Sequence, residues 1–124
     1  MTGIRLRSIV FDCPDPVALA SFYGQLLDGR TVTTDPAWCE VHLDGAGVKL
    51  AFQRADPYLA PAWPDGTPRQ VHLDLSVSEL VQTSARAVAL GATVLGEPVR
   101  EDNCHFLVHA DPAGHPFCLC VSDD

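Results

Sequence analysis

Lysine is almost absent from this sequence of 124 residues, which contains only one, Lys49. Lys and Arg together number eight against sixteen Asp and Glu, and the formal net charge at pH 7 is −8. Proteins that bind nucleic acids contact the phosphates with clustered basic side chains. The composition therefore argues against a nucleic-acid partner. It suits a neutral or cationic small ligand, although the simpler explanation is an acidic surface that keeps the protein in solution.

Long apolar runs are also missing. No segment of the sequence is an apolar run of the roughly 20 residues that a membrane-spanning helix needs. Residues 1–7 contain no apolar stretch of the kind that forms a signal peptide. Hydrophobic residues make up 47% of the chain, which is enough for a buried core. We therefore expect a single cytoplasmic domain, residues 1–124, with no membrane partner.

Paired cysteine motifs are the third absence. The five cysteines are an odd number and include no Cys-x-x-Cys, which is the spacing typical of structural zinc sites. Cys118 and Cys120 are two residues apart on an expected strand, so they share one face of it. We expect free thiols in a reducing compartment.

The most informative segment that is present covers residues 69–78, where hydrophobic and polar residues alternate strictly. A period of two predicts a strand with one buried face and one polar face. The buried face is assigned Val71, Leu73, Leu75 and Val77, and the polar face Gln70, His72, Asp74 and Ser76. His72 and Asp74 are then neighbours on the polar face, roughly 6.5–7 Å apart along the strand.

Two helices are predicted along the chain. The first begins at Pro16 after Asp15, a favourable N-cap, and ends at Asp28-Gly29. The second covers residues 79–90, with Ser78 as its predicted cap. Hydrophobic alternation and turn residues predict strands and loops in the rest. The strands are expected at 4–12, 31–34, 38–44, 48–54, 70–78, 92–95, 104–110 and 116–122, with a loop at 96–103 and a turn at 111–115.

These elements repeat. The order strand, capped helix, short strand and hairpin occurs in residues 4–54 and again in residues 70–122, with a proline-rich connector at 55–69. Each half is a βαβββ module whose helix covers one face of its sheet. The predicted fold is therefore α+β, with two βαβββ modules forming a curved mixed sheet that has a concave cleft.

The motifs resemble those of the vicinal oxygen chelate superfamily, which includes glyoxalase I, bleomycin-resistance proteins and extradiol dioxygenases. The matching segments are Asp15-Pro-Val-Ala-Leu-Ala-Ser-Phe-Tyr23 with Leu26-Leu27, His72-Leu-Asp-Leu-Ser-Val77, Leu90-Gly-Ala92 and Asp111-Pro-Ala-Gly-His-Pro-Phe117. Together with Trp63-Pro and the residues after Gly114, they are most similar to the subgroup called glyoxalase-like domains. The resemblance implies a homodimer that binds a small organic molecule.

The resemblance also implies where a metal would bind. The four ligand positions of metal-using members correspond to Ser8, a residue near Leu50, His72 and Cys118. His72 is the only conventional ligand kept, since leucine cannot ligate a metal and serine is a poor neutral ligand. We therefore expect no complete metal site and no cofactor. Asp74 or Cys120 could add a ligand, so a divalent metal is the alternative.

Without a metal, any catalysis would depend on the side chains of the polar face of residues 69–78. Histidine carries protons near neutral pH, and a nearby carboxylate can orient it. His72 and Asp74 are therefore the predicted catalytic residues, and Cys118 is a candidate nucleophile, with small apolar filler as its simpler role. The predicted ligand-binding residues are Ser8, Leu50, Phe52, Trp63 and Cys120. His105, His109 and His115 are expected at the surface or at strand edges.

Three functions remain open from the sequence. The first is a small-molecule-binding protein of the glyoxalase-like kind, with lyase- or isomerase-type proton transfer through His72 and Asp74. The second is a drug-binding protein of the bleomycin-resistance kind without catalysis. The third is a metal-dependent lyase or dioxygenase with a rearranged ligand set.

Overall fold

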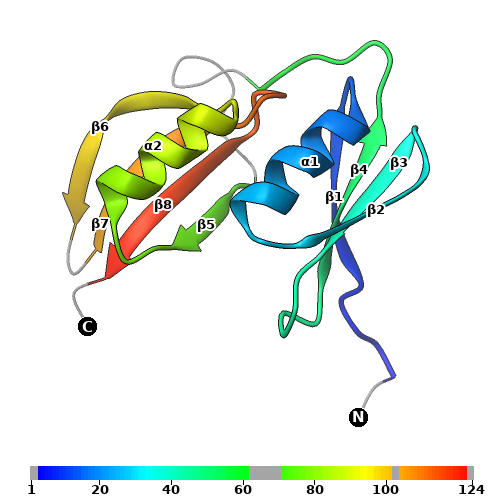
Figure 1. The fold of residues 1–124 in the computed structure, drawn as a ribbon, viewed down its shortest axis with the longest axis horizontal. Coiled ribbons are helices and arrows are strands. Elements are labelled where there is room, and N and C mark those ends of the chain that lie inside the picture. Colours follow the sequence, from blue (N-terminus) through cyan, green and yellow to red (C-terminus); the bar gives the residue numbers. More distant parts are fainter. Residues whose placement is uncertain (1–2, 62–70, 102–103, 123–124) are drawn as a thin grey trace. The chain divides into compact units, whose positions relative to one another are not determined.

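The computed structural model describes residues 3–61, 71–101 and 104–122 (Figure 1). The chain divides into two compact units, Met1–Tyr58 and Leu59–Asp124. Each unit contains one strand, then one helix, then three strands. Both are α+β units of the βαβββ type, so the predicted class and the two repeated modules are confirmed. The concave cleft stays a prediction.

The first unit is a four-stranded mixed sheet with one helix. Its sheet order is β1-β4-β3-β2, in which β1 pairs with β4 in parallel and the other pairs are antiparallel. Helix α1 packs against β3 and β4. The elements are β1 (Ser8–Cys13), α1 (Pro16–Leu26), β2 (Arg30–Asp35), β3 (Trp38–His42) and β4 (Lys49–Arg54).

The second unit repeats this topology. Its sheet order is β5-β8-β7-β6, and β5 pairs with β8 in parallel as β1 does with β4. Figure 1 shows α2 lying across one face of this sheet. The elements are β5 (Leu73–Ser76), α2 (Leu80–Leu90), β6 (Thr93–Glu101), β7 (Cys104–Ala110) and β8 (Pro116–Ser122).

The start of α1 agrees with the sequence prediction. Asp15 is the N-cap, and its Oδ1 accepts a hydrogen bond of 3.3 Å from the backbone N–H of Ala18. Pro16 occupies the first turn, where its missing N–H costs nothing. After the helix, Asp28 has φ of 54°. This is the left-handed conformation that an aspartate tolerates better than most residues.

Two local predictions in the second unit are wrong. The N-cap of α2 is Glu79 and not Ser78, and it makes no capping hydrogen bond through its side chain. Strand β6 continues to Glu101, through residues that were predicted to form a loop. The pairing of β6 with β7 shifts register between Leu95 and Val99. This irregularity, on the edge strand, accommodates Gly96 at φ of 88° and lets the pairing resume beyond it.

Aromatic rings fill the core of the first unit. Phe11 from β1, Tyr23 from α1 and Phe52 from β4 stack on one another with centroids 5.6–5.9 Å apart. Tyr23 and Phe52 are fully buried. Such rings contribute both a large buried apolar area and favourable stacking, so they fix α1 against its sheet.

The core of the second unit contains a histidine. His109 on β7 is 0% exposed and stacks on Phe117 with a centroid distance of 5.2 Å. Its Nδ1 lies 3.2 Å from the carbonyl of Leu107, and its Nε2 lies 2.8 Å from Oγ of Ser84 on α2. Because a carbonyl only accepts, Nδ1 carries the proton, and the neutral ring accepts the Ser84 hydroxyl at Nε2. The predicted surface position of His109 is therefore wrong.

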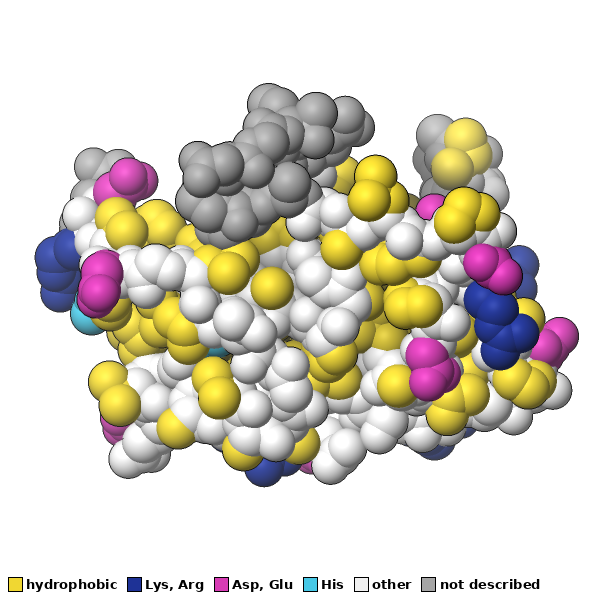
Figure 2. All heavy atoms as spheres, turned by 90° about the horizontal axis from the view of Figure 1, so that it is seen from above, with side chains coloured by type: hydrophobic (Ala, Val, Ile, Leu, Met, Phe, Trp, Pro, Cys, Tyr) yellow, Lys and Arg dark blue, Asp and Glu magenta, His cyan; other side chains and the backbone are white. Residues whose placement is uncertain are grey.

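The surface mixes charges of both signs. On the face drawn in Figure 2, acidic and basic side chains lie beside one another at several places, among hydrophobic and uncharged atoms. The excess of acidic residues is thus spread over this face and does not form one patch. No helix in the described part of the chain is long and apolar enough to cross a membrane.

The buried His109 predicts a loss of stability in mild acid. Burial lowers the pKa of His109 below 6.5, and the Leu107 carbonyl only partly opposes this. As the pH falls through 6.5, His109 becomes protonated in the unfolded chain but stays neutral in the folded chain. The free energy of unfolding should therefore fall with pH from that point, by at most about 1.4 kcal/mol per pH unit, until the folded-state pKa is passed.

Urea unfolding between pH 7.5 and 5.5 measures this dependence. His109→Gln should be less stable than the native chain but should show a flatter pH dependence. His105→Gln, on the same strand, is the matched control and should keep the native dependence. The same slope in native protein and His109→Gln would contradict this explanation.

Candidate functional site

The open face of the second sheet is the one that α2 does not cover. The parallel register of β5 and β8 places Asp74 beside Cys118 and Ser76 beside Cys120. The antiparallel register of β8 and β7 places Phe106 beside Cys120. Paired residues on adjacent strands point to the same side of a sheet. Side chains distant in the sequence therefore gather on this face.

They line a pocket with a volume of about 350 Å³, which we call the thiol pocket. All of its residues belong to the second unit, and three of them are cysteines. The lining consists of His72, Asp74, Glu101, Cys104, Phe106, Cys118 and Cys120. The predicted catalytic residues His72, Asp74 and Cys118 thus lie in one pocket.

His72 and Asp74 are in direct contact. Nε2 of His72 lies 3.1 Å from Oδ1 of Asp74, and the side chains are 34% and 66% exposed. The alternation that predicted this shared face holds along β5, where Leu73 and Leu75 are half-buried and Asp74 and Ser76 are exposed. It fails before the strand begins, because Val71 is 73% exposed and does not belong to the core.

Cys118 completes a compact group with these two residues. Its thiol is buried, at 5% exposure, next to Asp74 on the neighbouring strand. One ligand atom from each of His72, Asp74 and Cys118 lies within 4.8 Å of the other two. An imidazole, a carboxylate and a thiolate are donors that a divalent ion such as Zn²⁺ accepts. The residues present are therefore suited to hold a metal.

Cys120 is chemically different from a reactive cysteine. Burial, then the negative charge of Asp74, then the neighbouring Cys104 raise the pKa of the Cys120 thiol to about 12. The thiolate is the nucleophilic form of cysteine. Cys120 is therefore a neutral thiol that lines the pocket. All five cysteines lie in the described residues, and none of them forms a disulfide.

Three residues of the thiol pocket were not identified from the sequence. Cys104 and Phe106 share a face of β7 by alternation, but only the register with β8 shows that this face is the one with Cys120. Glu101 lies in the segment that was predicted to be a loop. Its side chain reaches the pocket because β6 continues to Glu101 and pairs it with Cys104.

The predicted ligand-binding residues of the first unit occupy two different faces. Leu50 and Phe52 are 4% and 0% exposed and belong to the core under α1. Phe52 stacks on Tyr23 of α1, and a role of Leu50 or Phe52 in ligand binding stays a prediction. Ser8 is half-buried beside Lys49 on the other face of the sheet. Trp63 lies outside the described residues.

The family model of the glyoxalase-like domain matches residues 8–120. The chain belongs to this family. The predicted resemblance to the vicinal oxygen chelate superfamily is thereby confirmed. No curated protein matches the sequence.

Several solved structures share the fold of this chain. A glyoxalase/bleomycin resistance protein/dioxygenase family enzyme from Burkholderia phytofirmans PsJN superposes with a TM-score of 0.76 at 17% identity, covering 96% of this chain and 99% of its own. A glyoxalase-related enzyme from Fulvimarina pelagi gives 0.72 at 21% identity, covering 95% and 88%. The oxidase ChaP-H2 gives 0.70 at 22% identity, covering 100% of both chains. At these identities the likeness shows the fold.

The raised pKa of Cys120 predicts slow alkylation. A rise from 9.0 to about 12 lowers the thiolate fraction about a thousandfold at pH 8. Iodoacetamide should therefore modify Cys120 far more slowly in the folded protein than in urea, as followed by mass spectrometry of the cysteine peptides.

Asp74→Asn should increase the rate of alkylation at Cys120, because it removes a negative charge that raises the thiol pKa. Glu101→Gln is the matched control, since Glu101 lines the same pocket, whereas the thiol pKa is raised by burial, Asp74, Cys104 and Cys118. Equal alkylation of Cys120 in folded and unfolded protein would contradict the assignment.

Proposed function

We propose that the protein binds a small organic molecule in the thiol pocket and transfers a proton to or from it through His72. The contact of 3.1 Å between His72 Nε2 and Asp74 Oδ1 carries this proposal. It lies in a pocket of the size that small ligands occupy. A histidine oriented by a carboxylate is a common arrangement for general acid–base catalysis.

The contact selects the tautomer of His72. Nε2 faces the Asp74 carboxylate at 3.1 Å, and an ionised carboxylate only accepts hydrogen bonds, so in this proposal the neutral ring carries its proton on Nε2. Nδ1 is then the unprotonated nitrogen that accepts a proton from a ligand. When Nδ1 is protonated, Nε2 keeps its proton and still faces the Asp74 carboxylate. His72 can therefore act as a base and then as an acid.

The lining of the pocket favours a neutral or cationic ligand. Asp74 and Glu101 are carboxylates, and none of the seven described residues of the lining is a lysine or arginine. Phe106 and the three cysteines offer apolar contact area. A neutral or cationic ketone with an acidic proton next to its carbonyl group fits this pocket, because its charge suits the carboxylates and its proton can be taken by His72.

Loss of His72 should abolish proton exchange. A panel of neutral and cationic ketones, such as dihydroxyacetone and aminoacetone, is incubated with the protein in D₂O, and the signals of the α-protons are followed by NMR. We expect exchange of at least one ketone, reduced about 10²-fold or more in His72→Gln. Asp74→Asn should give a smaller loss, because the ring remains but is no longer oriented.

His105→Gln is the control for the loss of an imidazole outside the pocket. Exchange that continues unchanged in His72→Gln would contradict the proposed base. Ligand binding that persists without any exchange in the native protein would instead favour a binding protein without catalysis. The predicted homodimer and cytoplasmic location stay predictions.

A metal-dependent function is the second candidate, because His72, Asp74 and Cys118 place three donor atoms within 4.8 Å of one another. Catalytic zinc sites combine three protein ligands with an open position. These three side chains would hold a divalent ion, which would supply Lewis-acid activation of a bound oxygen. Of the four positions that the resemblance implies, only His72 and Cys118 would then be used, with Asp74 as the added ligand that the sequence left open.

Cobalt(II) tests this candidate with a spectroscopic signal. Binding through Cys118 should give a sulfur-to-cobalt charge-transfer band in the near ultraviolet, since thiolate ligation produces it. The band should disappear in Cys118→Ser and persist in Cys120→Ser, which removes another thiol of the same pocket. Absence of the band in the native protein, or its loss only in Cys120→Ser, would rule out the proposed ligand set.

A further inference from the structure

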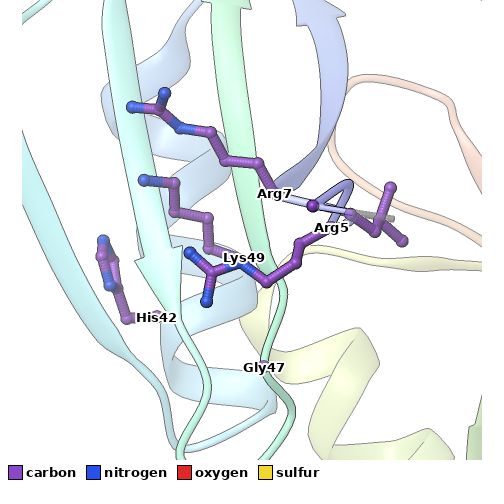
Figure 3. A pocket seen from close by; sticks show the side chains of 7 residues that line it. Arg5, Arg7, His42, Gly47 and Lys49 are labelled. Atoms are coloured by element: carbon purple, nitrogen blue, oxygen red, sulfur yellow. The ribbon is translucent and has the colours of Figure 1, made fainter. Parts of the chain in front are cut away.

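A second pocket lies entirely within the first unit and is lined by basic side chains. Its volume is about 580 Å³, and its side-chain lining consists of Arg5, Leu6, Arg7, His42 and Lys49. We call it the basic pocket. Figure 3 shows Arg5, Arg7 and Lys49 extending to the same side as His42. Three of the eight Lys and Arg residues of the chain therefore converge here.

Backbone pairing holds these residues together. The N–H of Lys49 donates a hydrogen bond of 3.3 Å to the carbonyl of Arg7, just before β1 begins. On the other side of β4, Lys49 lies opposite His42 of β3. The residue of β1 in register with Lys49 is Ser8, and Arg7 directly precedes it, so the backbones of Arg7, Lys49 and His42 are held on three adjacent segments. Backbone hydrogen bonds of the sheet, and not side-chain flexibility alone, therefore keep these residues close together.

One carboxylate accompanies the cluster. Oε1 of Glu40 lies 2.9 Å from Nε2 of His42 and 3.4 Å from Nζ of Lys49, and its Oε2 accepts a hydrogen bond from the Trp38 indole. The hydrogen bonds from Trp38 and His42, followed by smaller contributions from Lys49, lower the pKa of Glu40 to about 2. Glu40 is therefore an anion near neutral pH, and it neutralises one positive charge.

Arg5 and Arg7 have no such partner in the described part of the chain. Among residues 3–61, 71–101 and 104–122, neither guanidinium forms an ion pair or a side-chain hydrogen bond. Acidic residues outnumber basic ones by sixteen to eight in this chain. Despite this excess of carboxylates, the N–H groups of Arg5 and Arg7 are not used by the described residues and can bind a ligand. Three positive side chains against one carboxylate give a net charge of +2 at the pocket.

We propose that the basic pocket is a binding site for a small dianion, either a phosphate monoester or a dicarboxylate. Guanidinium groups bind both oxyanions with paired N–H donors, and the Lys49 ammonium adds a point charge. The net charge of +2 matches a doubly charged ligand, and Leu6, which is 69% exposed, offers contact to its apolar part. This site is independent of the thiol pocket and its proposed chemistry.

Titration followed by ¹H–¹⁵N NMR tests the site with two probes. Inorganic phosphate and malonate are added separately at pH 7.5, and sodium chloride at the same ionic strength is the reference. Saturable shifts should centre on the amides of Arg7, Lys49 and the neighbouring residues. Arg7→Gln and Arg5→Gln should each weaken binding by about fivefold or more, because each removes a charge-assisted hydrogen-bond donor pair.

Arg54→Gln is the matched control, because Arg54 lies at the other end of β4 and its guanidinium donates to the Pro36 carbonyl. It makes the same change in net charge and should leave the affinity unchanged. Binding of phosphate alone assigns a phosphate ligand, and comparable binding of malonate extends the site to dicarboxylates. Equal shifts with chloride, or equal weakening in Arg54→Gln and Arg7→Gln, would overturn the proposal.

Discussion

Parallel pairing between the first and last strand of each module is the constraint on which both sites depend. In the second unit, the register of β5 against β8 sets Asp74 beside Cys118 and so brings a carboxylate, an imidazole and a thiol together. In the first unit, the pairing of β1 with β4 extends to the hydrogen bond between Lys49 and Arg7. A shift of one residue would turn either set of side chains to the opposite face.

The two modules share a topology but differ in the chemistry of their open faces. The second presents thiols, carboxylates and one imidazole, whereas the first presents two arginines, a lysine and a histidine. Their helix-covered faces are both mainly hydrophobic, as the common fold requires, although the second includes the buried pair His109 and Ser84. Packing constrains only the covered face, so the open faces can differ widely while the fold is kept. The fold therefore identifies the family, and the residues on the open faces determine the proposed functions.

Burial favours the neutral form of each buried ionisable group, and the partners decide whether that preference prevails. His109 is surrounded by Phe117, Ser84 and the Leu107 carbonyl, so its neutral form is favoured and it ties α2 to the sheet. Cys120 is held as a neutral thiol by burial and by Asp74. Glu40 is half-buried, yet it stays charged because three donors surround it. The number of hydrogen-bond donors, more than burial itself, decides which group keeps its charge.

The sequence by itself determined the features that depend on neighbours a few residues apart. The Asp15 cap, the turn around Asp111, the shared face of His72 and Asp74 and the repeat of the modules all follow from local spacing, and the structure contains each of them. Only the tertiary structure decided which strands are neighbours and in which register. It placed Glu101, Cys104 and Phe106 in the thiol pocket, turned Leu50 into the core, buried His109 and brought Arg7 to Lys49. These contacts join residues that are far apart in the chain, and local periodicity carries no information about the strand pairings that create them.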